Sequence, residues 1–164
     1  MLKNAVPPPS RGFAARLQLG IFMLTLSAGA ATAADEIEFD LDQARWVDRI
    51  LVVAANSAQQ RDLLAMTEEV EAHACEFANR DLRLLLVIAA STLRLDGKAV
   101  EAQSAAGIIA RLVPGAEEFS MRLIGKDGAV KQRWGSAVPA QEIFAVIDGM
   151  PMRRGESSAD TDCH

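Results

Sequence analysis

The sequence predicts an α/β domain in which a βαβ unit is followed by a helix and then by a ββα unit. Two apolar runs, 50–55 and 82–90, flank a segment with apolar residues at helical spacing, a pattern typical of parallel strands joined by a crossover helix. Two further segments meet at Asp127-Gly128, a sequence that favours a hairpin turn, and an apolar helix follows them.

The βαβ unit comes first. The apolar, β-branched run Ile50–Ala55 ends at Asn56-Ser57, and we expect Ser57 to cap the helix that follows. One helix is predicted over about 58–78, because five apolar residues recur there at helical spacing: Leu63, Met66, Val70, Ala74 and Phe77. The second strand is predicted over 82–90, parallel to the first.

The second half begins with a turn at Asp96-Gly97 and a helix over 100–112. Apolar and polar residues alternate over 119–124, and 129–134 can return antiparallel after the Asp-Gly turn. A last helix is predicted over 139–149, since proline is tolerated in a first helical turn and glycine commonly ends a helix.

The two ends of the chain have separate signals. Residues 1–33 combine Lys3 and two arginines with an apolar stretch, 17–30, and the small-x-small site Ala31-Thr32-Ala33, so we expect a signal peptide removed after Ala33. The apolar stretch is shorter than the ~20 residues of a membrane-spanning helix, so we expect no stable span after cleavage and a periplasmic or secreted protein.

The rest of the chain divides into three parts. We expect residues 34–48 to form an acidic arm or short edge strand, residues 45–156 to form the domain, and residues 157–164 to form a disordered tail. Residues 1–33 hold three of the 17 basic residues and none of the 22 acidic ones, so the remainder has a formal charge of −8. Such a charge disfavours binding to nucleic acid and to anionic membranes.

The predicted order is that of the thioredoxin core, so we expect a thioredoxin-like three-layer sandwich. Redox-active proteins of that fold place a reactive cysteine at the start of the helix after the first strand. This sequence reads Asn56-Ser57-Ala58-Gln59 there, without a cysteine pair. We therefore expect no conventional redox catalysis, no enzymatic activity of the usual thioredoxin type, and no cofactor.

The two cysteines, Cys75 and Cys163, leave alternatives open. They can form one disulfide, or Cys75 can remain an inert thiol, because Glu71 and Glu76 and its place near a helix C-terminus disfavour a thiolate. His73 and Cys75 point to widely separated sides of a helix, so we expect no metal site.

Two clusters of charged residues are weak candidates for a partner-binding site. The first is Lys126, Asp127 and Lys131 in the hairpin, and the second is Arg153 and Arg154 after the last helix. Both have a plain structural interpretation, because the Asp-Gly pair serves the turn and cations offset a helix dipole. The alternative is a small basic recognition patch on an acidic domain.

Four motifs resemble an exported bacterial family, domain of unknown function 4174: Arg45-Trp46-x-x-Arg49, Arg80-Asp81-Leu82, Leu123-Ile124-Gly125-Lys126-Asp127-Gly128 and Ile147-Asp148-x-Met150-Pro151-Met152-Arg153-Arg154. The resemblance implies a thioredoxin-like domain that also occurs in vertebrate extracellular-matrix proteins of the sushi-repeat and coiled-coil-domain-containing 80 type. It implies no activity and no catalytic residue.

These observations favour an exported, non-redox thioredoxin-like module that binds a protein, a peptide or an envelope component. An extended partner would pair with the hairpin edge, and the basic side chains would attract an acidic ligand. The alternative is an atypical thiol oxidoreductase or peroxiredoxin-like protein that uses Cys75.

Overall fold

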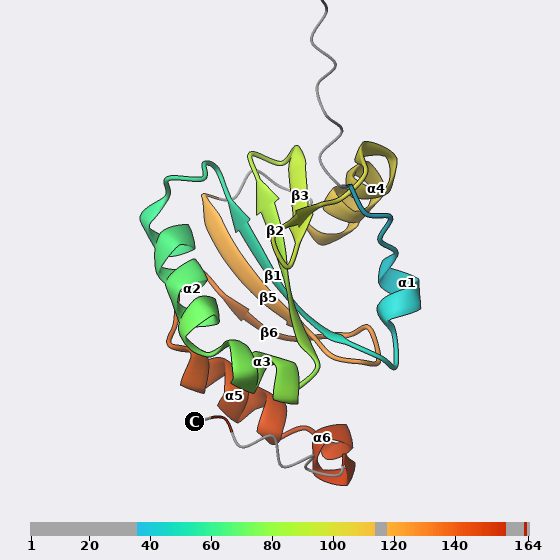
Figure 1. Ribbon diagram of the computed structural model, residues 1–164, viewed down its shortest axis with the longest axis vertical. Helices are drawn as coiled ribbons and strands as arrows, with labels where there is room; N and C mark the ends of the chain where they lie inside the picture. The colour runs from blue at the N-terminus through green and yellow to red at the C-terminus, as the bar shows by residue number, and fades with distance from the viewer. Residues whose placement is uncertain (1–35, 114–117, 157–162, 164) are drawn as a thin grey trace, which may run out of the picture. The chain divides into compact units, whose positions relative to one another are not determined.

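The computed structural model describes residues 36–113, 118–156 and 163, and Figure 1 shows their arrangement. In these residues six strands form one mixed sheet in the order β4-β3-β2-β1-β5-β6. The strands are β1 Arg49–Ala55, β2 Leu82–Ile88, β3 Thr92–Leu95, β4 Lys98–Ala99, β5 Phe119–Ile124 and β6 Val130–Trp134. The six helices of this part are α1 Leu41–Ala44, α2 Arg61–Ala72, α3 Ala74–Asn79, α4 Ala102–Leu112, α5 Ala140–Asp148 and α6 Pro151–Gly155.

The predicted α/β class is confirmed, and β1 is the strand around which the domain is built. It pairs in parallel with β2 and antiparallel with β5, so Ile50 lies opposite Arg83 on one side and Ile124 on the other. All seven residues of β1 are buried, because helices cover both faces of the sheet at this strand. This burial explains its continuous apolar sequence.

The side chains of β1 alternate between two apolar cores. Ile50, Val52 and Ala54 belong to the core shared with α1 and α4. Leu51, Val53 and Ala55 belong to the core shared with α2, α3 and α5. Figure 1 shows the same division, with α1 and α4 on one side of the sheet and α2 and α5 on the other. The domain therefore has helix, sheet and helix layers.

The helix predicted over 58–78 differs from the structure at its start and in its interior. The single helix expected over 58–78 is divided at His73, whose φ of −119° and ψ of 28° lie outside the helical region. The first part, α2, begins at Arg61 after the cap residue Gln60, which makes no side-chain cap bond. Ser57 is not the cap, because residues 57–60 form a turn in which Gln60 N–H donates to the Ser57 carbonyl.

The hairpin of β3 and β4 was not predicted from the sequence. Residues 89–90, expected to extend the second strand, end it instead, because Ala89 and Ala90 have φ angles of 52° and 50°. The predicted turn at Asp96-Gly97 exists, but it joins β3 to β4 rather than leading into a helix. A four-residue strand beside a two-residue strand gives too short a pattern to detect from alternation.

The acidic N-terminal segment is part of the folded domain. Ile37 forms a parallel bridge with Val100, and α1 follows Asp40, whose carboxylate accepts a hydrogen bond from Asp42 N–H. Phe39 and Leu41 are buried in the core beneath α4. Residues 37–44 therefore pack into the domain, and Ile37 adds a single bridge at the edge of the sheet.

Both expected end segments, the signal peptide over 1–33 and the tail over 157–164 apart from Cys163, lie outside the described residues. Within the residues that the structure describes, none of the helices has the length and apolar character needed to cross a membrane.

Candidate binding site at the hairpin end of the sheet

Arg49, the first residue of β1, lies at the centre of a group of ion pairs. Its side chain is 1 % exposed, although it carries a charge. Arg49 Nη1 donates to the Arg80 carbonyl at 2.8 Å, and Arg49 Nη2 donates to Glu156 Oε1 at 2.8 Å. The start of β1 is thus tied to the loop before β2 and to the residue after α6.

Lys126 extends this group from the turn between β5 and β6. Lys126 Nζ lies 2.7 Å from Asp81 Oδ2 and 2.9 Å from Glu156 Oε1. Burial by itself lowers the pKa of Lys126, but the hydrogen bonds and charges of the two carboxylates outweigh it, and the pKa is raised. The same balance acts on Glu156: burial raises its pKa, whereas Arg49 and Lys126 lower it to about 2.

Arg80 and Arg153 join the C-terminal helices to this group. Arg80 Nη2 lies 2.8 Å from Asp148 Oδ2, and its guanidinium carbon lies 4.2 Å from the centre of the Phe144 ring. Arg153 Nη1 donates to the Asn79 carbonyl at 3.0 Å, and Arg153 Nε lies 3.5 Å from Asp148 Oδ1. The short helix α6 is therefore held against the end of α3.

We call this set the ion-pair cluster. In the described part of the chain it contains four cations and three carboxylates: Arg49, Arg80, Lys126, Arg153, Asp81, Asp148 and Glu156. Arg49 Nε is buried and has no hydrogen-bond partner among the described residues. The cluster thus has an excess of positive charge and one unpaired buried donor in a protein whose net charge is negative.

A cavity of about 570 Å³ adjoins the cluster. One wall is charged and comes from Arg49 and the hairpin, which contributes Lys126, Asp127 and Lys131. The facing wall is apolar and comes from α5, α6 and their connection: Ala145, Val146, Gly149, Met150, Pro151 and Met152. We call this space the hairpin cavity.

Asp127 and Lys131 form an ion pair at the hairpin cavity, with Lys131 Nζ 2.5 Å from Asp127 Oδ2. The hydrogen bond from Lys131 is the largest of the effects that lower the pKa of Asp127, and the Ala129 N–H adds to it. Asp127 Oδ1 also accepts from Ala129 N–H at 3.1 Å, so this carboxylate stabilises the turn as well.

The five candidate residues from the sequence occupy three environments. Lys126, Asp127 and Lys131 line the hairpin cavity. Arg153 is half-buried in the ion-pair cluster, and Arg154 is exposed and donates to the Gly149 carbonyl at 3.1 Å. The structure therefore separates two residues, Arg153 and Arg154, that adjacency in sequence grouped together.

Five residues of the ion-pair cluster were not among the predicted site residues: Arg49, Arg80, Asp81, Asp148 and Glu156. All but Glu156 lie within the motifs that carry the family resemblance. One signal in the sequence could have identified Arg49: it is a charged residue next to the apolar run 50–55, and a charge beside a buried strand needs partners. Local sequence does not identify those partners.

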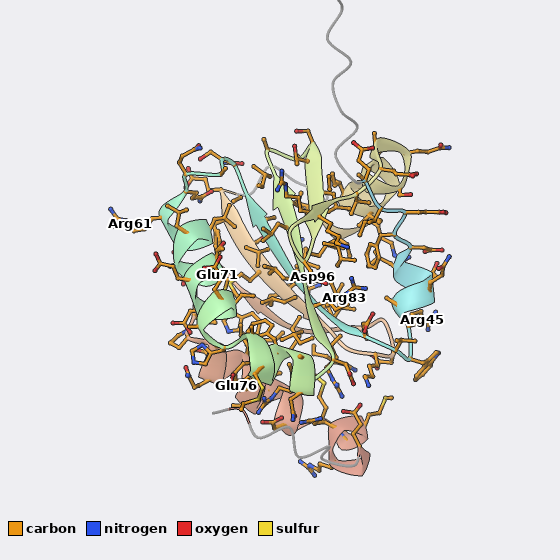
Figure 2. All side chains as sticks on the ribbon, viewed as in Figure 1. Arg45, Arg61, Glu71, Glu76, Arg83 and Asp96 are labelled. Atoms are coloured by element: carbon orange, nitrogen blue, oxygen red, sulfur yellow. A yellow bond between two sulfur atoms is a disulfide. The ribbon has the colours of Figure 1, made fainter. Side chains whose placement is uncertain are left out.

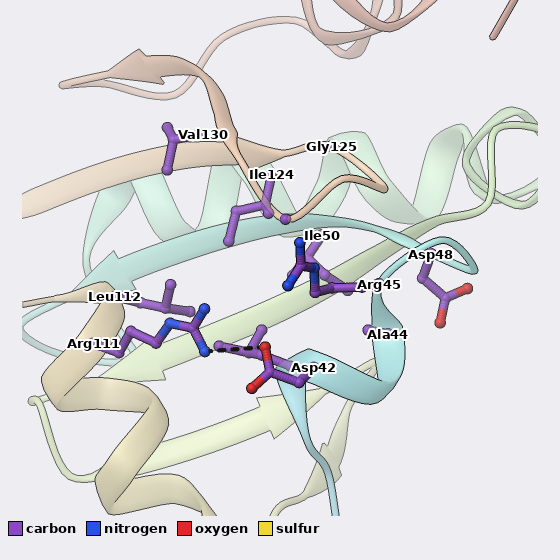
Figure 3. A pocket seen from close by; sticks show the side chains of 12 residues that line it. Asp42, Ala44, Arg45, Asp48, Ile50, Arg111, Leu112, Ile124, Gly125 and Val130 are labelled. Carbon is purple, nitrogen blue, oxygen red and sulfur yellow. Dashed lines mark hydrogen bonds and ion pairs between the residues drawn. The ribbon is translucent and has the colours of Figure 1, made fainter. Parts of the chain in front are cut away.

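A second, smaller cavity of about 170 Å³ lies at the other face of the sheet, where Ile50, Leu112 and Ile124 form part of its lining. Figure 3 shows Arg45 and Arg111 entering it from different elements, with Arg111 Nη1 3.4 Å from Asp42 Oδ1. Asp48 also lines this cavity, so its two arginines are matched by two aspartates. It offers no excess of charge to a ligand.

A further set of ion pairs lies along β2. Arg83 Nε lies 2.8 Å from Asp96 Oδ2, and Figure 2 shows these two side chains beside each other, whereas Arg61 on α2 points away from the sheet. Asp96 Oδ1 also accepts from Leu84 N–H at 2.8 Å, so the pair fixes the β3–β4 turn to β2. A structural role accounts for these residues.

The region after β1 offers no thiol chemistry. Asn56 and Ser57 occupy it, and both cysteines of the chain are bonded to each other as the Cys75–Cys163 disulfide. Among the described residues, no group of three or more His, Cys, Asp or Glu side chains could hold a metal ion. The lining of the hairpin cavity combines fixed cations with apolar side chains, a mixture that is common in small-molecule sites.

The sheet, its two covered faces and the charged cavity define an α/β protein with a candidate ligand-binding site at one end of the sheet. A family model described as domain of unknown function 4174 matches residues 40–156, and the chain belongs to that family. The match includes α1 and ends at Glu156, the last residue of the ion-pair cluster. None of the curated proteins or solved structures compared with the chain matches it.

Proposed function

We propose that this protein is an exported, thioredoxin-like module that binds a partner and does not catalyse thiol–disulfide exchange. The pattern of residues 1–33 supports export. The thioredoxin-like assignment is supported by the order β2-β1-β5-β6, in which the first pair is parallel and the others are antiparallel, and by α4 packing on the face opposite α2 and α5.

The observation that carries the binding role is the free edge of β6 beside the hairpin cavity. Among the described residues, strand β6 pairs with β5 alone, and its three central residues, Lys131, Gln132 and Arg133, are exposed. An extended segment of a protein, peptide or envelope component can add a strand to such an edge through backbone hydrogen bonds. The cations favour a partner with acidic residues.

The test is a selection of extended peptides from a displayed random library on the purified protein. We expect the selection to yield acidic peptides that bind the wild type. These peptides should bind the Arg133→Glu variant at least tenfold more weakly. The matched control is Lys98→Glu, which reverses an exposed charge on β4 at the opposite edge of the sheet. Peptides that bind both variants as well as the wild type would reject β6 as the docking edge.

The second candidate function is an atypical thiol oxidoreductase that uses Cys75. With Cys75 and Cys163 bonded to each other, a nucleophilic thiol first requires reduction of this disulfide. An insulin reduction assay with thioredoxin as the reference separates the two functions. We expect no turnover above background from the wild type or from Cys75→Ser, and turnover that Cys75→Ser abolishes would establish the oxidoreductase instead.

A further inference from the structure

We infer that the hairpin cavity binds a small organic carboxylate with an apolar body. This inference goes beyond the proposed function: it assigns a ligand class to the cavity beside the β6 edge, and it can hold whether or not an extended partner docks on that edge. It depends on three features of the cavity: an unpaired donor on Arg49, an excess of positive charge, and a facing apolar wall.

The first feature is the bonding of the Arg49 guanidinium. Nη1 and Nη2 each have an acceptor at 2.8 Å, whereas Nε is buried without a partner among the described residues. A buried donor left unpaired costs roughly 1–3 kcal/mol, and more on a charged group. Arg49 also lines the hairpin cavity, and its charge therefore lies at the cavity wall. Because Nε itself is buried, a ligand acceptor completes its bonding only when the side chains around it shift.

The second feature is the charge around that position. The ion-pair cluster has four cations for three carboxylates, and Lys131 with Asp127 adds a neutral pair at the cavity. A fourth carboxylate would balance the cluster. Charge-assisted hydrogen bonds to arginine and lysine are the strong contacts by which such a group is held.

The third feature is the wall opposite the cations. Val146, Met150 and Pro151 present apolar surface to the cavity, and Met152, which also lines it, is 43 % exposed. Methionine adapts to ligands of different shape. A hydrophilic anion would leave this wall in contact with water, and a neutral apolar ligand would leave the excess charge unbalanced.

The size of the cavity agrees with a small molecule. Its volume of about 570 Å³ falls inside the range of roughly 300–1,000 Å³ found for small-molecule sites. A carboxylate with a medium-length hydrocarbon body satisfies all three features, with its head at Arg49 and Lys126 and its body along α5 and α6.

The experiment titrates the purified protein, disulfide intact, with decanoate and with two matched probes, decanol and decylammonium. Binding is followed by calorimetry and by the methyl NMR signals of the methionines. We expect saturable decanoate binding that shifts the signals of Met150 and Met152 and leaves the buried Met66 unchanged. Decanol and decylammonium should bind at least tenfold more weakly, and equal binding of all three probes would overturn the inference.

Two variants test the location. Arg49→Lys keeps the charge and removes the guanidinium, but a buried substitution of this kind can impair folding. Ala145→Glu avoids that problem, because Ala145 is an exposed wall residue on α5, and the added carboxylate should weaken decanoate binding at least tenfold. The matched control is Ala110→Glu, at an exposed position on α4, which should bind decanoate like the wild type.

The outcomes separate this inference from the proposed function. If selected peptides depend on Arg133 but decanoate does not bind, the carboxylate inference is wrong and the peptide-binding module stands. If decanoate binds and Ala145→Glu abolishes it while no peptide is selected, the inference is supported and the partner is a small molecule rather than a strand. If Ala145→Glu and Ala110→Glu bind decanoate equally well, the hairpin cavity is not the site.

Discussion

Arg49 Nη2 and Glu156 Oε1 lie 2.8 Å apart, although 107 positions separate the two residues in the sequence. The pair joins the first residue of the central strand to the residue after the last helix. Because Arg49 is 1 % exposed and Glu156 is 22 % exposed, the contact is mostly shielded from water. Removing this contact therefore tests how strongly the residue after α6 is held to the central strand.

Glu156→Ala is expected to destabilise the domain. Removing one partner of a buried pair leaves the other charge uncompensated, which costs about 3–5 kcal/mol in full burial, and we expect about 2–3 kcal/mol here because Glu156 is partly exposed. Urea unfolding followed by circular dichroism measures the change. Glu68→Ala on the exposed side of α2 is the control, and equal stability of the two variants would contradict a structural role for the Arg49–Glu156 pair.

The stability of the wild type should fall in acid in a specific window. The pKa of Glu156 is lowered from 4.5 to about 2 in the folded protein, so the folded state binds this proton less readily than the unfolded state. The resulting stabilisation is complete above pH 4.5 and is lost as the pH falls toward 2, with a size of about 3 kcal/mol. Unfolding free energies at several pH values should decline more steeply for the wild type than for Glu156→Gln, and parallel curves would refute the assignment.

The Cys75–Cys163 disulfide should contribute strongly to stability. It joins residues 88 positions apart, and in the chain-entropy model a loop of this length gives about 4.6 kcal/mol. The double variant Cys75→Ser/Cys163→Ser should lose about this free energy of unfolding, and reductant should not affect it further. Intact mass after alkylation provides the check: two alkyl groups should appear only after reduction, and alkylation without reductant would contradict the bond.

Gly128→Ala should destabilise the hairpin by about 1–2 kcal/mol. Gly128 has a φ of +79°, where a side chain is strained, and an added Cβ would lie 3.1 Å from Arg45 Nε. Gly128→Asn should cost less, because asparagine tolerates this conformation better than alanine. Gly135→Ala is the matched control, since nothing lies within 4 Å of its added Cβ. Thermal unfolding measures all three, and equal losses at Gly128 and Gly135 would disprove the strain.

The fold could be predicted where one local pattern was sufficient. The apolar run of β1, the helical spacing of α4 and α5 and the Asp-Gly turn between β5 and β6 each specify their own structure within a few residues. The break at His73 could not be predicted, because the helical pattern continues across it. The strands β3 and β4 could not be predicted either, because they are too short to show an alternating pattern. Burial of Phe39 and Leu41 depends on α4, which lies about 60 residues further along the chain.

The candidate site could be predicted only in part, for a related reason. Lys126, Asp127 and Lys131 were predicted from the sequence because they surround a recognisable turn, and all three line the hairpin cavity. Arg153 and Arg154 were grouped by their adjacency, whereas in the structure Arg153 is half-buried among carboxylates and Arg154 is exposed. Two adjacent residues on a short helix point in different directions, so their neighbours are set by the packing of α6.

The sequence by itself determined the α/β class, the buried central strand, the hairpin and the lack of a cysteine after β1, because each of these depends on residues close together in the chain. Tertiary structure alone decided that Arg49, Lys126 and Glu156 meet at one end of the sheet. Ion pairs form wherever packing brings opposite charges within a few ångströms, and that packing follows from the pairing of β1 with β2 and β5. The cavity, its excess charge and its apolar wall exist only after those strands and the C-terminal helices have come together.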